Sequence, residues 1–496
     1  MKQIRKLFFF MILFIVFYFN QAIGKDLLVQ NATMIDGTGN PPQENISILI
    51  RQGKIIRIGQ DIEAEGIRRL DVKGAFVLPG LIDAHVHLMF GPGAILHYPT
   101  VPTKETWRIT WGRYFPQYLR AYLACGVTTI LDMGAPPFVI HDVRQHLSTG
   151  NPGPRYLTVG QFISPTRGYP GVLIPKRLPG STEDSFFPFY YEISNIADLK
   201  IKLDLIQSMN TMGIKISCEK GWSPFENLPR HSPEMLEAIK QEATKRKLPL
   251  YVHATSEEDM TTAVKLGAHA LAHTLVSREN KNLSAQFVAE MAKRNTFQMT
   301  TLSTMDASLI YYYPERLNDP LLDLVVPETE LITARNSELR RLSHKLLLSS
   351  RLPEPLKSEA ESLAGGSYLK NIWELSLKNS KQGILHLHES GVPIVMGSDA
   401  TYFPLALYAF HGPTSLREIE LLGESGLSPV EAIKAATITP ARMLGMESQI
   451  GTIEVGKEAD LVVVKNNPLT DLSTFRTIQW TIKGGVAHTP KEWMSQ

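Results

Sequence analysis

The sequence has little cysteine: only Cys125 and Cys218 occur in 496 residues, and neither lies in a C-x-x-C motif or a Cys/His cluster. A disulfide scaffold and a thiolate zinc site are therefore excluded. An excess of one charge is also missing, because 51 Lys and Arg face 49 Asp and Glu and the formal net charge is +2. Nucleic-acid binding needs a strongly basic face or domain, so we expect no nucleic-acid partner.

Long hydrophobic runs are equally scarce, and the one clear example stands at the start of the chain. Three basic residues precede the apolar run 7–19, and the small residues Ala22 and Gly24 follow it. This order is typical of a secretory signal peptide. The run is shorter than the roughly 20 residues that a bilayer requires, which disfavours the alternative of a permanent membrane anchor. We predict a signal peptide over 1–24, a periplasmic or extracellular location, and no membrane contact after cleavage.

Both ends of the remaining chain have a β-like texture. Short apolar runs alternate with turn signals over 27–29, 46–50, 54–58 and 74–78, and the same texture returns at 459–464 and 480–483. Neither end is long enough to bury a core alone. We therefore predict one small β-domain built from two halves, residues 25–78 and 441–496.

The middle of the chain, residues 79–440, alternates between strand-like and helix-like segments. The helical segments carry start signals such as Ser232-Pro233, a capping residue followed by proline at the first helical position. Eight strand-like runs lie at 82–87, 127–133, 155–164, 213–217, 248–253, 270–273, 296–302 and 393–399. Such alternation implies parallel βαβ units, and eight of them indicate an α/β fold of the (β/α)₈ barrel type.

One connection is unusually long and spans 303–392. Excursions at the carboxyl end of a barrel strand often shape or cover the substrate. The alternative is a set of extra helices that pad the outside of the barrel. The sequence leaves both interpretations open.

The sharpest local signal is His85-Val86-His87 in the first of these runs. Residues i and i+2 of a strand point to the same side, so His85 and His87 present two imidazoles to one point. Two neutral imidazoles on a rigid strand are half of a zinc-type site. The pair alone is a weak signal.

Four further candidates lie in or at the ends of other predicted strands, which is the catalytic end of a barrel. Lys215 is a cation inside an apolar run, where burial without a partner is costly. His253, His273 and Asp399 each close a run. Separately, each has an ordinary alternative: a lysine reaching solvent, a core histidine, or a helix-capping aspartate. Jointly they predict a metal site.

The collective pattern resembles the metal-dependent amidohydrolase superfamily, and within it the branch of imidazolonepropionase and the prolidase-like dipeptidases. The resemblance covers nearly all of the chain after residue 24 and implies a metal-binding (β/α)₈ barrel flanked by a β-sandwich made from both ends. It rests on Pro79-Gly80-Leu81-Ile82-Asp83-Ala84-His85-Val86-His87, Gly126-Val127-Thr128-Thr129, Gly153-Pro154-Arg155, Ile214-Lys215, Val252-His253-Ala254, Gly397-Ser398-Asp399, Ala435-Ala436-Thr437, Pro440-Ala441, Leu444-Gly445, Gly451-Thr452 and Gly456-Lys457-Glu458-Ala459-Asp460-Leu461.

The resemblance implies two divalent metal ions in one centre. His85 and His87 match ligands of one ion, and His253 and His273 match ligands of the other. Zinc is the ion we expect, although imidazole and carboxylate ligands also serve manganese, cobalt and iron. The chain departs from many relatives at Ala272, where they often have Glu.

The remaining roles concern the bridge and the substrate. Lys215 matches the family lysine that reacts with carbon dioxide to give a carbamate bridging both metals, which removes the cost of a buried ammonium. Asp399 matches the acid that binds the first metal and handles protons. Arg155, Tyr169 and His411 are candidate substrate contacts, and Tyr169 stands where many relatives have His.

These residues predict hydrolysis of an amide bond in a small substrate, a dipeptide or an N-acyl amino acid. Two bridged cations lower the pKa of the water between them, and one polarises the carbonyl, while Asp399 moves the proton to the leaving amine. Two alternatives stay open. One is a mononuclear cyclic-amide hydrolase, deaminase or lactonase, and the other is a secreted binding protein without turnover. The sequence does not decide the substrate or the oligomeric state, and a homo-oligomer is compatible with it.

Overall fold

The computed structural model describes residues 26–91, 104–170, 190–221, 227–276, 282–349, 367–401 and 408–496. The predicted signal peptide over 1–24 lies outside these ranges. Within them, no helix combines the length and the apolar character that crossing a membrane requires.

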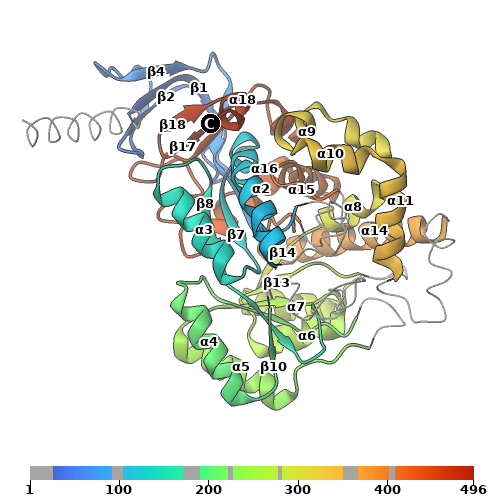
Figure 1. Ribbon diagram of the computed structural model, residues 1–496. Helices are drawn as coiled ribbons and strands as arrows, with labels where there is room; N and C mark the ends of the chain where they lie inside the picture. Colours follow the sequence, from blue (N-terminus) through green and yellow to red (C-terminus); the bar gives the residue numbers. More distant parts are fainter. Residues whose placement is uncertain are drawn as a thin grey trace, which may run out of the picture.

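The two ends of the chain share one eight-stranded sheet (Figure 1). Strand β5 of the first end pairs antiparallel with β16 of the second, with Val77 opposite Val463, both fully buried. β5 also pairs with β1, so it joins the two halves. The strands are β1 (Leu27–Met34), β2 (Gln43–Arg51), β3 (Lys54–Gly59), β4 (Arg68–Asp71), β5 (Phe76–Pro79), β16 (Leu461–Val464), β17 (Ile478–Lys483) and β18 (Val486–His488).

Two parallel sheets form the centre of the molecule, in the orders β6-β7-β8 and β10-β9-β11-β12-β13-β14-β15. Every one of the eight predicted runs contains a strand, and the run 155–164 contains two, which belong to different sheets. The strands are β6 (Leu81–Val86), β7 (Val127–Asp132), β8 (Arg155–Thr158), β9 (Phe162–Pro165), β10 (Tyr190–Ile193), β11 (Ile214–Ser217), β12 (Leu250–His253), β13 (Ala270–Ala272), β14 (Phe297–Met299) and β15 (Ile394–Val395).

Backbone hydrogen bonds join both edges of the three-stranded sheet to the seven-stranded sheet. On one side Ala84 N of β6 donates to Met396 O after β15 at 3.1 Å, and Asp399 N donates to His85 O at 2.7 Å. On the other side Met212 N, just before β11, donates to Thr158 O of β8 at 2.8 Å. The carboxyl ends of these strands therefore gather at one end of a shared structure.

Helices cover the outside of the parallel strands (Figure 1). As predicted, α5 begins at a capped serine: Ser232 Oγ accepts a hydrogen bond from Met235 N, Pro233 is the first helical residue, and Ile239 and Ala243 are buried. These outer helices are α2 (Lys104–Ala124), α3 (Pro137–Ser148), α4 (Ile196–Ser208), α5 (Pro233–Arg246), α6 (Glu257–Leu266), α7 (Ala285–Arg294), α15 (Pro413–Glu424), α16 (Pro429–Ala435) and α17 (Ile438–Met443). A short helix, α18 (Pro490–Met494), ends the chain.

The described part of the long connection 303–392 consists of helices joined by short turns. Its elements are α8 (Ser303–Leu309), η3 (Pro314–Asn318), α9 (Pro320–Val325), α10 (Glu328–Arg335), α11 (Ser337–Ser349) and α14 (Ser367–Glu389). In Figure 1 α9, α10, α11 and α14 lie together along the right side of the molecule. Buried residues of α8, α9 and α10 belong to the main hydrophobic core. These helices are thus an integral layer of the fold.

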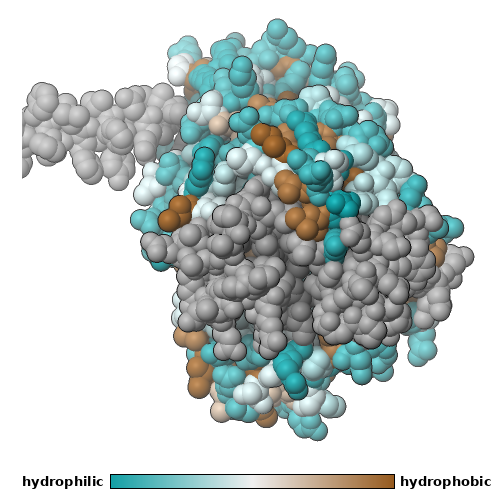
Figure 2. All heavy atoms as spheres, turned by 45° about the vertical axis from the view of Figure 1, so that its right-hand side comes forward, coloured by the Kyte–Doolittle hydropathy of each residue, from teal (hydrophilic) through white to brown (hydrophobic). Residues whose placement is uncertain are grey.

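The residues that Figure 2 colours are mostly hydrophilic on the face it presents, with apolar side chains in small groups. Exposed large apolar residues include Ile201 and Leu205 of α4, at 60% and 45% exposure. Scattered apolar side chains of this kind are ordinary on protein surfaces.

Candidate metal centre

The two histidines of the H-x-H motif meet an aspartate from the far end of the sequence. His85 lies in β6 and His87 directly follows it, while Asp399 follows β15. The Nε2 atoms of His85 and His87 lie 3.3 and 3.2 Å from Asp399 Oδ1. One ligand atom from each of the three residues falls within 4.8 Å of the others, a spacing that suits one metal ion.

A second pair of histidines adjoins this group. His253 ends β12 and His273 follows β13, and their ring centres are 4.4 Å apart. The His273 ring is 5.0 Å from the His85 ring, and its Nδ1 lies 3.7 Å from Asp399 Oδ2. Asp399 therefore stands between the two histidine pairs.

Lys215 of β11 completes the set. Its side chain is 1% exposed, and Nζ has no hydrogen-bond partner among the described residues. Burial lowers the pKa of Lys215 to about 7, against the attraction of Asp399. Burial lowers the pKa values of His85, His253 and His273, and the charge of Lys215 lowers each of them further. Lys215 Nζ lies 5.8 Å from the centre of the Phe162 ring, which is 6.5 Å from the His253 ring. All six predicted residues thus come together.

The local sequence explains how these side chains are held. Asp83, two residues before His85, accepts hydrogen bonds from His85 N, from Ser398 N and from Ser415 Oγ at 3.2, 3.0 and 2.6 Å. His273 and Asp399 both have left-handed backbones, with φ of 74° and 53°. Non-glycine residues in this region are strained, and such strain concentrates at functional sites.

The electrostatics of the site favour a cation. Burial lowers the pKa of His85 to about 3, which keeps its imidazole neutral. Burial opposes the ionisation of Asp399, yet its close electrostatic contacts with His85, His87 and His273 hold its pKa well below the usual range. Neutral imidazoles and an ionised carboxylate are the forms that bind metal ions.

Buried polar atoms without hydrogen-bond partners give an independent test of whether these residues fit a metal ion. His85 Nδ1 and Nε2, Lys215 Nζ and Asp399 Oδ1 are buried without a partner of hydrogen-bond geometry among the described residues. Buried polar groups are normally paired, so several lone ones at one point call for a missing partner. A divalent cation satisfies imidazole and carboxylate atoms together, and the residues present fit one.

Comparisons with known proteins identify the family of the chain. Residues 76–487 match the model of the amidohydrolase family. The chain belongs to the amidohydrolase family. The resemblance noted in the sequence motifs is thereby confirmed, and this family is generally metal-dependent.

Individual relatives match shorter stretches of the amidohydrolase. A segment of 85 residues is 33% identical to an N-acyl-D-aspartate deacylase of Alcaligenes xylosoxydans xylosoxydans, covering 17% of this chain and 16% of that protein. Another of 76 residues is 40% identical to an imidazolonepropionase of Symbiobacterium thermophilum, covering 15% and 17%. The chain therefore matches less than a fifth of the length of these two curated relatives.

A solved structure matches almost the whole fold. The crystal structure of a Xaa-Pro dipeptidase with bound methionine in the active site has a TM-score of 0.68 and 22% sequence identity. It covers 94% of this chain, and the match includes 100% of that chain. The likeness shows that the two proteins share a fold of helices and parallel strands.

The structure places the three predicted substrate contacts in different surroundings. Tyr169 lies at the centre, where its ring stacks on that of His253 with centres 3.9 Å apart and planes 18° apart. Arg155 begins β8, at the opposite end of the strands, and donates to Asp460 Oδ2 at 2.8 Å and to Thr129 Oγ1 at 3.0 Å. The prediction that Arg155 contacts substrate is corrected, because its guanidinium binds Asp460, the residue before β16 of the eight-stranded sheet.

His411 also needs a correction. Its side chain is buried, and both ring nitrogens have partners: Nδ1 and Tyr122 Oη are 2.9 Å apart, and Nε2 and Phe90 O are 2.7 Å apart. Burial lowers the pKa of His411 to about 4. His411 therefore braces the segment that follows His87 and has no nitrogen left for a substrate.

Sequence reasoning missed Glu219. Its carboxylate is buried beside the second histidine pair, with Oε2 at 3.4 Å from His253 Nε2. A usable signal existed, because Glu219 lies four residues after Lys215 and residues of equal parity in a strand share a side. The strand ends at Ser217, however, so the alternation of sides along a strand does not extend to Glu219.

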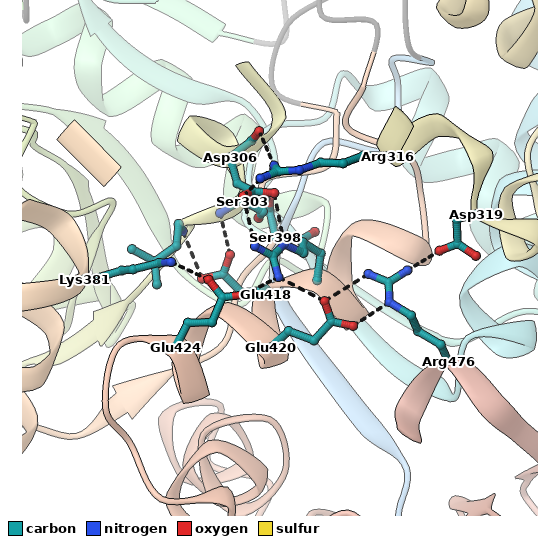
Figure 3. Close-up of polar contacts among 12 residues, drawn as sticks. Ser303, Asp306, Arg316, Asp319, Lys381, Ser398, Glu418, Glu420, Glu424 and Arg476 are labelled. Carbon is teal, nitrogen blue, oxygen red and sulfur yellow. Dashed lines mark hydrogen bonds and ion pairs between the residues drawn. The ribbon is translucent and has the colours of Figure 1, made fainter. Parts of the chain in front are cut away.

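A pocket of about 340 Å³ lies beside the amidohydrolase centre, between the long connection and α15. Ser303 at its wall donates through Oγ to Ser398 O at 2.8 Å, one residue before Asp399. No metal-centre residue lines it among the described ranges. Its polar walls belong to a chain of ion pairs, drawn in Figure 3, that links Lys381, Glu424, Arg417, Asp306, Arg316, Glu420, Arg476 and Asp319.

Proposed function

We propose that this protein is a metal-dependent hydrolase that cleaves an amide bond in a small substrate, a dipeptide or an N-acyl amino acid. The observation that carries the proposal is the convergence of four histidines, a buried lysine and a buried aspartate at the carboxyl ends of parallel strands. Catalytic residues of barrel enzymes lie at this end. Buried polar atoms that lack partners among the described residues supply the second support.

Two divalent ions, zinc in our proposal, would have distinct protein ligands. His85 and His87 would hold one ion together with Asp399, and His253 and His273 would hold the other. When bound, such ions lower the pKa of a water molecule and polarise the scissile carbonyl. The Asp399 carboxylate, ionised and nearly enclosed, would take the proton of the attacking water at Oδ2 and deliver it to the leaving amine.

Lys215 would bridge the two ions as a carbamate. In this reaction the unprotonated Nζ would form a bond to the carbon of carbon dioxide while one C=O π bond opens and leaves its electron pair on oxygen. One N–H bond would break, and the proton would leave to solvent. The product is an anion facing two cations, which resolves the burial of an ammonium without a partner. The lone position of Nζ among the described residues supports this step.

The substrate class rests on relatives as well as on the site. A named relative removes an acyl group from an N-acyl amino acid, and the matching solved structure is a dipeptidase. Both names describe cleavage next to an amino acid. The second candidate is a mononuclear enzyme acting on cyclic amides, favoured by the short match to imidazolonepropionase. A single bound metal and an unmodified Lys215 would distinguish it.

The finer architecture and the location are also proposals. We propose that residues 79–440 form a closed (β/α)₈ barrel, and that residues 25–78 and 441–496 form a β-sandwich. The hydrogen bonds that join both edges of the three-stranded sheet to the seven-stranded one support closure. Apolar clusters on both faces of the eight-stranded sheet support the sandwich. Residues 1–24 would act as a cleaved signal, leaving the enzyme in the periplasm or outside the cell.

The test is product identification by mass spectrometry. The purified protein lacking residues 1–24 is incubated with zinc, bicarbonate and a pooled library of dipeptides and N-acyl amino acids, alongside an Asp399→Asn variant. We expect selective loss of one chemical series with the wild type and none with the variant. A folded two-metal sample that consumes no member would overturn the substrate class and turn the search to ring amides, deamination and lactones.

A further inference from the structure

Glu219 is a buried carboxylate without a lysine or arginine partner. Its side chain is 1% exposed, and among the described residues the only basic group within 4.0 Å of its oxygens is His253. The neighbouring cations are engaged elsewhere: Lys220 pairs with Glu258 at 2.6 Å, and Arg230 pairs with Asp259 at 2.8 Å. A buried charge of this kind is costly unless hydrogen bonds satisfy it.

Three donors fix the orientation of this carboxylate. Gly221 N donates to Glu219 Oε1 at 2.7 Å, and Thr255 Oγ1 donates to Oε2 at 2.5 Å. The third is His253, whose Nε2 lies 3.4 Å from the same Oε2. Gly221, in the same turn as Glu219, and Thr255, two residues after His253, hold the carboxylate in place. It therefore presents a fixed acceptor to the imidazole of His253.

The imidazole of His253 is constrained on its face as well as at its edge. Tyr169 stacks on one face of the ring. The His273 ring lies nearly perpendicular, at an interplanar angle of 67°. A ring held in this way can rotate little, so the atom it offers to a metal depends on which nitrogen carries the hydrogen.

We propose that Glu219 is a positioning residue that keeps the hydrogen of His253 on Nε2 and thereby leaves the lone pair of Nδ1 for the metal. A carboxylate only accepts hydrogen bonds, and a metal-binding imidazole is neutral with one N–H. Outer carboxylates of this kind fix the tautomer and raise the basicity of the ligand. The inference rests on the proposed metal centre and adds to it a residue that contacts a metal ligand without contacting the metal.

The test compares Glu219→Gln with the wild type by metal affinity. The glutamine has the same shape, but its amide NH₂ can face Nε2 and favour a hydrogen on Nδ1. We expect the variant to bind the ion at His253 and His273 about 10- to 100-fold more weakly, with the other ion unaffected. Competition with a chelator measures both affinities, and the visible spectrum of the cobalt(II)-loaded protein reports the geometry of each ion without reference to turnover.

The matched control is Asp259→Asn. Asp259 is fully buried and accepts from Lys220 N at 3.3 Å, so it supports the segment carrying Glu219 without touching His253. We expect this variant to lower stability while both metal affinities stay unchanged. Equal weakening in the two variants, or unchanged affinity in Glu219→Gln, would overturn the inference. Complete loss of that ion in Glu219→Gln would also overturn it, because it would make Glu219 a direct ligand. A wild type without two ions would instead contradict the proposed centre itself.

Discussion

A β-carbon placed on Gly397 would lie 2.6 Å from the β-carbon of His85. Real β-carbon contacts are longer, so the segment that carries Asp399 can approach β6 only because residue 397 has no side chain. We predict that Gly397→Ala separates Asp399 from the two histidines. The cost should be about 1–3 kcal/mol of unfolding free energy, as for other overpacked sites, and metal affinity should fall with it. Urea unfolding and chelator competition measure the two effects.

The control for this substitution is Gly112→Ala. Gly112 lies on an exposed part of α2, and an added β-carbon would meet no heavy atom within 4 Å. Alanine in a helix interior is more favourable than glycine by about 0.5–1 kcal/mol, so this variant should be slightly more stable and bind metal normally. Equal behaviour of both variants would show that the contact with His85 is unimportant.

The ion pairs of Figure 3 should contribute measurably to stability. Arg417 donates to both oxygens of Asp306, at 3.0 and 3.1 Å, and the Asp306 side chain is only 4% exposed. Removing Arg417 takes one of two basic partners from Asp306, which keeps Arg316 at 2.9 Å, and it also removes a partner of Glu420 and of Glu424. We expect Arg417→Met to cost about 1.5–3 kcal/mol, as for the loss of hydrogen bonds to charged groups. Arg294→Met breaks an exposed i,i+4 pair with Glu290 and should cost less than about 0.5 kcal/mol. Similar denaturation midpoints for the two variants would contradict this account.

Glu330 of α10 should make stability depend on pH. Burial raises its pKa to about 8, although a hydrogen bond from Tyr118 Oη opposes the shift. From pH 4.5 to about 8 the folded state keeps a proton that the unfolded chain has lost, so the free energy of unfolding falls as the pH rises. One unit of pKa difference is worth about 1.4 kcal/mol, so the total loss is at most roughly 5 kcal/mol.

Urea unfolding between pH 4 and pH 9 tests this dependence with Glu330→Gln. The glutamine cannot ionise, so the variant should lose less stability across the window than the wild type. Glu328→Gln, on an exposed position of the same helix, should follow the wild-type profile. Parallel profiles for Glu330→Gln and the wild type would assign the dependence to other groups.

Lys215→Ala should abolish metal binding and activity together. The variant removes the atom that would form the bridge between the ions, and it also removes a buried amine, so the fold should survive. Lys220→Ala is the comparison, because Lys220 lies five residues later and pairs with Glu258 outside the centre. Metal analysis of both proteins checks the prediction. Two ions retained in Lys215→Ala would rule out the bridging role.

The sequence predicted most of the framework because the relevant signals are local. Apolar runs located every parallel strand of the described residues except β10, and the i, i+2 rule placed His85 and His87 on one side. The architecture then brought Lys215, His253 and Asp399 to the same end. Each step needed only neighbouring residues and a fold type.

The failures concern contacts between distant segments. Arg155 was expected at the substrate because it belongs to a family motif, but Asp460, from the other end of the chain, binds its guanidinium. His411 is a predicted substrate contact, whereas Tyr122 and Phe90 occupy both of its ring nitrogens. Side-chain partners more than 200 residues away follow from packing, which periodicity and spacing do not report.

The central claim is that amide cleavage by this enzyme requires two metal ions. The most direct test measures turnover while metal is added back to metal-free protein. The purified enzyme is stripped with a chelator, and amide cleavage is measured while zinc is restored in the presence of bicarbonate. The account predicts no cleavage without metal and full activity at two ions per chain. Undiminished cleavage by fully metal-free protein would contradict it.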